Sequence, residues 1–190
     1  MFERDIIRQL SAWKMDVNRK PLVIHGARQV GKTWALKYFG KVYFEDVAYF
    51  SLDKDESGLC DIFKTTKDPR RIIQQLSFLH GKKINPQTTL LILDEIQECN
   101  EALNALKYFC EEAPEYAVAC AGSLLGIYLN HIGNSFPVGK VNHLSMYPLT
   151  FTEFLKTKDP NMYEYLCSIK EICPLPPVSY THLRAHETKA

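Results

Sequence analysis

The chain has 190 residues, of which 46% are hydrophobic and 24% charged, which suits one globular domain with a packed core and leaves room for a fragment of a second. Its formal net charge of +1 gives no overall field that would draw it to nucleic acid or to a membrane surface. No apolar run approaches the ~20 residues of a membrane span. Charges in MFERDIIRQL occupy the place of a signal peptide's apolar core, so a cytoplasmic location is expected.

The six cysteines are scattered along the chain, with no CxxC pair and no companion histidines at ligand spacing. This arrangement favours neither a disulfide framework nor a zinc site. We expect small buried thiols in a reduced protein.

The first half of the chain is predicted to alternate between helices and buried strands. Gly40 is expected to end the helix that begins at Thr33. The apolar periodicity predicts helices over 3–14, 33–40, 55–64 and 68–79, and strands over 21–26 and 47–52.

The second half continues the alternation. TTLLILDE and YAVACAGS are apolar without a polar face, as expected of strands that are covered on both sides. Strands that alternate with helices predict an α/β layered domain with a mainly parallel sheet. The predicted elements are strands over 88–95, 116–123 and 138–147, and helices over 100–112, over 123–130 and from FTEFL after Pro148.

GARQVGKT, residues 26–33, fits the phosphate-loop pattern GxxxxGK[ST]. Glycines let successive amides point inward around an anion, and the following helix presents its N-terminus to the same phosphates. Lys32 is expected to reach the β- and γ-phosphates, and the Thr33 hydroxyl to ligate Mg²⁺. The Arg28 and Gln29 side chains are expected to be solvated, with phosphate or a neighbour as the alternative. The predicted nucleotide-binding residues are Gly26, Ala27, Arg28, Gln29, Val30, Gly31, Lys32 and Thr33.

Three further polar residues are expected at the carboxyl edge of the sheet, where open α/β sheets bind ligands. Asp94 ends an apolar strand and can hold Mg²⁺ through water, opposite Thr33. Glu95 can orient and deprotonate a water molecule beside the γ-phosphate; the alternative is that both acids cap the next helix. Ser123 can sense the γ-phosphate or the water, or simply cap a helix. The expected catalytic residues are therefore Lys32, Glu95 and Ser123.

Aromatic residues near these motifs, Tyr49 and Phe50 among them, are expected to be core. His25 is likewise expected to be a packed histidine rather than a catalytic one.

The motifs GARQVGKT, LLILDEIQ, AGSLLG and FPVGKVNHLSMYPLTFTEFL together resemble the AAA-type ATPases found in many copies in bacterial and archaeal genomes. In that family a C-terminal domain of unknown function follows the ATPase domain. The resemblance implies a P-loop NTPase three-layer sandwich, with the AVACAGS strand between the other two motif strands. It also implies ATP hydrolysis with Mg²⁺, with the family's motifs at Gly26, Gly31, Lys32 and Thr33, at Asp94 and Glu95, and at Ser123.

The resemblance also sets the expected domains: an ATPase domain over 1–157 and the start of a truncated C-terminal region over 158–177. The last residues, 178–190, contain VSYTHLRAHET, which resembles the translation of a common sequencing adapter. We expect the natural sequence to depart from this chain near Pro177.

The functional prediction is ATP hydrolysis coupled to movement of a C-terminal effector. The alternatives are a nucleotide-binding switch with little turnover and a small-molecule phosphotransferase. No arginine finger can be identified, so self-association or a partner is expected to supply one. Nucleic-acid binding is unsupported, since no stripe of basic and aromatic residues is present.

Overall fold

The computed structural model describes residues 4–53, 58–123 and 139–169. The chain divides into two compact units, residues 5–148 and a second unit made of residues 1–4 and 149–190. Apart from Ser123, the helix predicted over 123–130 lies outside the described residues, as does the tail 178–190.

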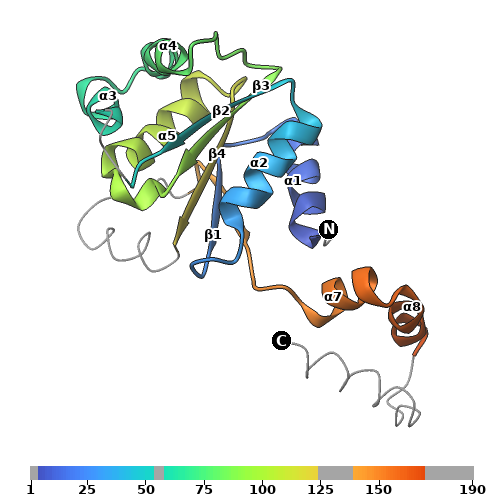
Figure 1. Ribbon diagram of the computed structural model, residues 1–190. Helices are drawn as coiled ribbons and strands as arrows, with labels where there is room; N and C mark the ends of the chain where they lie inside the picture. Colours follow the sequence, from blue (N-terminus) through green and yellow to red (C-terminus); the bar gives the residue numbers. More distant parts are fainter. Residues whose placement is uncertain (1–3, 54–57, 124–138, 170–190) are drawn as a thin grey trace. The chain divides into compact units, whose positions relative to one another are not determined.

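The larger unit is built on a five-stranded sheet in the order β2-β3-β4-β1-β5, and every pairing is parallel (Figure 1). The prediction of a mainly parallel sheet is therefore confirmed. Strand β4 lies between β1 and β3, as the resemblance implied. The strands are β1 (Leu22–Gly26), β2 (Asp46–Ser51), β3 (Thr89–Asp94), β4 (Ala117–Ser123) and β5 (Asn142–Ser145).

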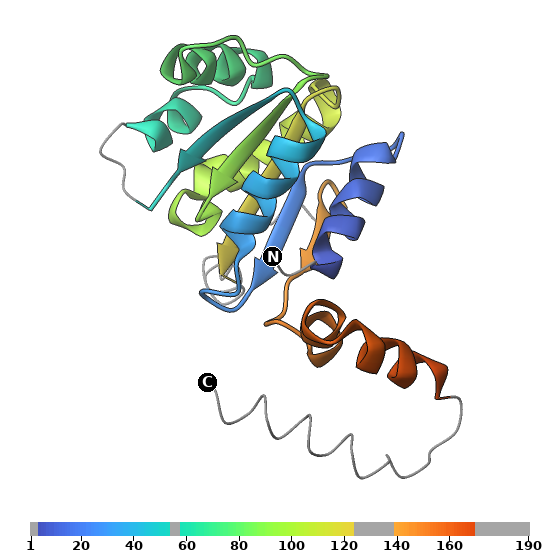
Figure 2. The same ribbon diagram turned by 45° about the vertical axis from the view of Figure 1, so that its right-hand side comes forward.

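Helices cover both faces of this sheet, which gives the expected three layers (Figures 1 and 2). One face carries α1 and α2, and the other carries α3, α4 and α5. The helices are α1 (Asp5–Met15), α2 (Lys32–Tyr43), α3 (Leu59–Thr65), α4 (Pro69–His80) and α5 (Asn100–Glu112).

Strand β3 shows why the central strands have no polar face. Leu90 and Ile92 pack into the core beneath α1 and α2, whereas Leu91 and Leu93 pack into the core on the other face. Because successive side chains point to opposite faces of a sheet, a strand between two cores needs apolar residues at every position. Burying each such side chain contributes about 1.5–3 kcal/mol.

The prediction that Gly40 ends a helix is wrong, because α2 continues to Tyr43. A Cβ atom at Gly40 would lie 2.6 Å from Val47 Cγ2 and 3.2 Å from Leu90 Cδ2. The glycine is therefore needed for the close approach of α2 to the sheet, and its position inside the helix is set by packing.

The expectation that all the cysteines are free thiols is also wrong, since Cys60 and Cys99 form a disulfide. The bond joins α3 to the residue directly before α5, across a sequence separation of 39 residues. Both cysteines are buried. Spacing along the chain could not reveal this pair, because only the packing of α3 against α5 brings the two residues together. Cys110, Cys120 and Cys167 are free.

The described part of the smaller unit contains α7 (Phe151–Lys158) and α8 (Pro160–Ser168). Helix α7 begins with a capping box, in which the Thr150 hydroxyl accepts from the Glu153 N–H and the Glu153 carboxylate accepts from the Thr150 N–H. Glu153 also accepts from Arg4 Nε at 3.3 Å. Helix α7 was predicted, whereas α8 was not. Among the described residues, no helix has the length and hydropathy of a membrane span.

Candidate functional site

The segment between β1 and α2 forms a tight loop that depends on glycine at two positions for different reasons. A Cβ atom at Gly26 would lie 2.1 Å from the backbone oxygen of Met146, so the chain passes too closely there for any side chain. Gly31 caps α2 with a φ of 95°, in the left-handed region that glycine adopts most readily. The loop therefore leads directly into the first turn of α2. The free backbone N–H groups of that turn can bind an anion.

Lys32 is 8% exposed and its ammonium group lies against the loop itself. Its Nζ donates to the backbone oxygens of Ala27 at 2.7 Å and Gly26 at 3.1 Å. Burial lowers the pKa of Lys32, while the negative charges of Glu95 and Asp94 oppose that shift. The ammonium group is thus held in the loop, with the Glu95 and Asp94 carboxylates near enough to affect its pKa.

Asp94 connects the end of β3 to the start of α2. Its Oδ2 atom accepts hydrogen bonds from the Thr33 hydroxyl at 2.8 Å and from the Tyr49 hydroxyl at 3.0 Å. Its Oδ1 atom accepts from the Glu95 N–H at 3.1 Å. With 5% of its surface exposed, the carboxylate is held in one orientation.

Tyr49 was expected to be core only. The residue does pack against the core beneath α1 and α2, but its hydroxyl group also contacts Asp94. Burial and the nearby Asp94 carboxylate raise the pKa of Tyr49 to about 12. The residue therefore remains a hydrogen-bond donor to Asp94 across the neutral pH range.

Glu95 follows directly and adopts a left-handed backbone conformation with φ of 51°. It precedes the short 3₁₀ helix η2 (Ile96–Glu98), and its side chain makes no capping hydrogen bond there. The carboxylate instead accepts from Gln97 Nε2. Glu95 therefore occupies the N-cap position of η2 without a side-chain capping bond, and its carboxylate contacts Gln97 instead.

Gln97 was missed as a functional residue, although it is the last residue of the DEIQ motif. Its side chain is 4% exposed and joins two elements. While Nε2 donates to Glu95, Oε1 accepts from the Ser123 N–H at 3.3 Å. Gln97 thus ties the acid after β3 to the last residue of β4.

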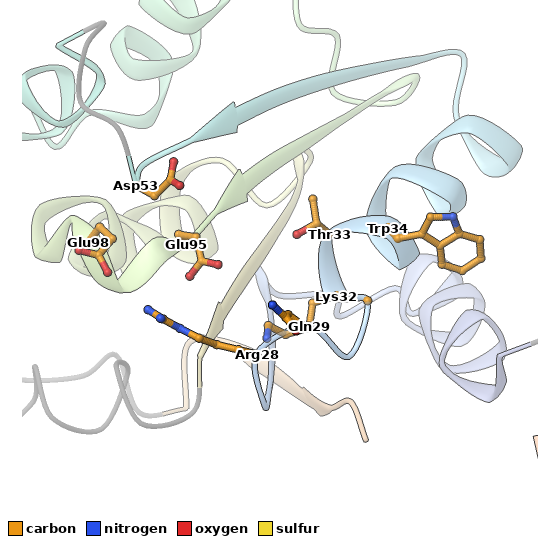
Figure 3. Close-up of a pocket in the computed structure, with 9 residues that line it drawn as sticks. Arg28, Gln29, Lys32, Thr33, Trp34, Asp53, Glu95 and Glu98 are labelled. Atoms are coloured by element: carbon orange, nitrogen blue, oxygen red, sulfur yellow. The ribbon is translucent and has the colours of Figure 1, made fainter. Parts of the chain in front are cut away.

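These elements surround a cavity of about 510 Å³ at the carboxyl edge of the sheet (Figure 3). Two of its lining residues, Gln29 and Glu95, are the two non-glycine residues with positive φ in the described part of the chain. Such backbone strain concentrates at functional sites. The residues that line the cavity are Arg28, Gln29, Gly31, Lys32, Thr33, Trp34, Asp53, Glu95 and Glu98.

The cavity therefore collects most of the predicted site residues, with informative exceptions. Asp94 lies behind Thr33, one hydrogen bond from the lining. Ser123 pairs with Gly26 in the sheet and does not line the cavity. The Val30 side chain packs against the core, and Gly26 and Ala27 are not among the lining residues. Trp34, Asp53 and Glu98 line the cavity without having been predicted, because no local motif marks them.

Comparison with known proteins points to one family. The profile of the AAA domain family matches residues 18–155, which is more than half of the chain. No curated protein gives a significant match.

Among solved structures, the chain is similar to PCH-2 from C. elegans, with 12% identity and a TM-score of 0.46 over 89% of this chain and 50% of that one. It is also similar to AMPPCP-bound DnaA from Aquifex aeolicus, with 16% identity and a TM-score of 0.47 over 93% of this chain and 53% of that one. The chain spans about half the length of each.

Proposed function

The chain belongs to the AAA domain family, and from this membership and the geometry of the site we propose that it binds ATP with Mg²⁺ and hydrolyses it. Family membership implies ATP binding and hydrolysis in general. The roles of individual residues are inferred from the contacts around the cavity.

The phosphates are proposed to bind the loop of residues 26–33. Its backbone turns into the first turn of α2, where free amides and the helix dipole attract negative charge. Lys32 already lies against the loop carbonyls and lines the cavity, so a rotation of its side chain would bring the ammonium group to the β- and γ-phosphates. Arg28, which also lines the cavity, adds a second positive charge there.

The residues present fit a magnesium ion. Mg²⁺ takes oxygen ligands and is usually held by one or two carboxylates together with phosphate oxygens and water. Thr33 and Asp94 place a hydroxyl and a carboxylate oxygen 2.8 Å apart beside the loop. Thr33 would bind the ion directly and Asp94 through water, and the bound ion would neutralise charge that develops on the phosphates.

Glu95 is proposed to act on the attacking water. Its carboxylate lines the cavity together with Lys32 and Thr33, and Gln97 directs it. A carboxylate in this position can accept a proton from the water as the water oxygen bonds to the γ-phosphorus and the bond from that phosphorus to the β–γ bridging oxygen breaks, which releases ADP. Such general-base help is worth about 10²–10⁴-fold in rate. Gln97 would connect this step to Ser123 at the end of β4.

The observation that carries the proposal is the hydrogen bond between Thr33 and Asp94. It joins the phosphate loop to the acid pair, although the two motifs are far apart in sequence. A site that only bound a phosphate anion would need no carboxylate next to the loop. The carboxylates of Asp94 and Glu95 instead favour a site that holds a cation and activates water.

Coupling of hydrolysis to movement of a C-terminal effector remains part of the proposal, as do the expected domain limits at residues 157 and 177. The rate of this chain alone would depend on an arginine finger, which is worth about 10³–10⁵ in related phosphoryl transfers. We propose a second copy or a partner as its source.

The test follows the label of [γ-³²P]ATP in the presence of Mg²⁺. We expect free phosphate to appear and Lys32→Ala to abolish its release. Retained ATP binding with no release under any concentration of the chain would favour the nucleotide-binding switch. Label on a small-molecule acceptor would favour the phosphotransferase.

A further inference from the structure

Trp34 is the one aromatic residue among the nine that line the cavity in the described part of the chain. It follows Thr33 directly in the first turn of α2. Its side chain is 42% exposed, whereas Phe39 on the same helix is fully buried. The proposed roles in phosphate binding, magnesium binding and water activation do not use this indole.

The indole ring is held in a defined orientation. It stacks on the ring of Tyr38 with centroids 5.1 Å apart and an angle of 9° between the planes. Residues four apart on a helix are neighbours on its surface, so the stack needs no distortion of α2. Tyr38 therefore fixes the plane of Trp34 at the edge of the cavity.

The acidic residues and Trp34 lie at opposite ends of the cavity. Figure 3 shows Asp53, Glu95 and Glu98 toward one end and Trp34 toward the other, with Lys32 and Thr33 between them. If Glu95 activates water at the γ-phosphate, the γ-phosphate lies at the acidic end of the cavity. The β- and α-phosphates then follow along the phosphate loop. Its nucleoside then lies at the end where Trp34 lies.

We propose that Trp34 is a stacking platform for the nucleobase of the bound nucleotide. The assignment rests on the proposed nucleotide binding and adds to it the residue that holds the nucleobase, which an inorganic polyphosphate would not use. Every base has a π-face, so stacking alone favours a nucleoside without selecting among the bases. The neutral base also lies away from the three carboxylates, and the charged phosphates lie on the cations of the loop.

The test compares binding of Mg²⁺-ADP, Mg²⁺-ATP and Mg²⁺-tripolyphosphate by calorimetry. Trp34→Ala is expected to weaken binding of both nucleotides by about 5- to 150-fold, the range for loss of one base–aromatic stack. Binding of tripolyphosphate should stay unchanged, and Trp34→Phe should keep most of the nucleotide affinity. Phe78→Ala is the matched control, because Phe78 is an aromatic residue that is 89% exposed on α4 and is absent from the cavity lining.

Fluorescence gives a second measurement. The chain has two tryptophans, and the other, Trp13, is buried in α1. We expect ADP to quench the emission of the wild-type protein and to leave that of Trp34→Phe unchanged, while tripolyphosphate quenches neither.

Two results would overturn the stacking proposal alone: equal loss of nucleotide and tripolyphosphate binding in Trp34→Ala, or no loss of either. The first would show damage to the loop, and the second would show that the base lies elsewhere. If the wild-type protein binds neither nucleotide nor tripolyphosphate, the proposed function fails first and the stacking proposal fails with it.

Discussion

The Thr33 hydroxyl donates a hydrogen bond to Asp94 Oδ2 at 2.8 Å, although 61 positions separate the two residues. The topology accounts for the contact. Strands β1 and β3 run parallel with β4 between them, so their carboxyl ends reach the same edge of the sheet. Thr33 is in the first turn of the helix that follows β1, and Asp94 is the last residue of β3.

This contact predicts that Asp94 determines the magnesium dependence of ATP binding. Asp94→Asn keeps the size of the side chain and removes its charge. We expect the gain in ATP affinity on adding Mg²⁺ to fall by about 10–100-fold, the usual effect of losing a residue that holds a metal through an intermediary. Calorimetric titration of ATP with and without Mg²⁺ measures the gain.

Asp53→Asn is the control for that measurement. Asp53 also lines the cavity, but its carboxylate accepts from Ser51 and not from Thr33. An equal loss in both variants would mean that the cavity's overall charge, and not the Thr33–Asp94 pair, holds the ion.

Gln97 is predicted to be a positioning residue for Glu95. Without its side chain the Glu95 carboxylate loses its donor, and a small displacement of a catalytic group can cost on the order of 10² in rate. We expect Gln97→Ala to lower kcat by that order and to leave KM for ATP nearly unchanged. Steady-state phosphate release measures both constants.

The same variant also removes the hydrogen bond from the Ser123 N–H to Gln97, and a hydrogen bond of this kind contributes about 0.5–1.5 kcal/mol to stability. Urea unfolding separates this loss of stability from the catalytic effect. Glu98→Gln serves as the comparison, since Glu98 accepts only a 3.4 Å contact from Gln97. A parallel rise in KM in Gln97→Ala would contradict a positioning role.

The Cys60–Cys99 disulfide is predicted to stabilise the larger unit. Closing a loop of 39 residues lowers the entropy of the unfolded chain by an amount worth about 4 kcal/mol at 25 °C. Urea unfolding with and without a reductant should show a loss of this order, and Cys60→Ser should lose stability without further response to the reductant. Peptide mapping under non-reducing conditions that finds both thiols free would refute the bond.

Gly40→Ala is predicted to destabilise the protein, even though alanine is favoured over glycine in a helix by about 1 kcal/mol. The added methyl group would meet Val47 Cγ2, and overpacking of this kind costs about 1–3 kcal/mol. Val42→Ala, at a position on the same helix that is 54% exposed, should be neutral or slightly stabilising. If Val47→Ala fails to rescue Gly40→Ala, the steric explanation is wrong.

Local pattern was sufficient for most of the fold. Helix α5 follows from apolar residues at helical spacing, and strand β4 follows from an unbroken run of small and apolar residues, because both patterns are local in sequence. The phosphate loop was recognisable for the same reason, since its residues are contiguous. Gly40 was misread because a glycine near the end of an apolar period can mean either a helix end or a close contact, and only the neighbouring strands decide.

Asp94 and Glu95 were predicted from their place at the end of an apolar strand, but the residues that contact them could not be, because those contacts join distant segments. The Tyr49 hydroxyl reaches Asp94 from the neighbouring strand, and Gln97 reaches Ser123 across 26 positions. No local motif marks Tyr49, and Gln97 is marked only as the last residue of DEIQ. The Cys60–Cys99 disulfide likewise joins residues that are distant in sequence. The roles assigned to Lys32 and Glu95 remain predictions.

Glu95→Gln tests the central claim most directly, because it keeps the size of the side chain and removes the proposed base. With Mg²⁺ and ATP, the account predicts that this variant binds ATP with an affinity near that of the wild type, while phosphate release falls by about 10²–10⁴-fold. Phosphate release from Glu95→Gln at the rate of the wild-type protein would contradict it.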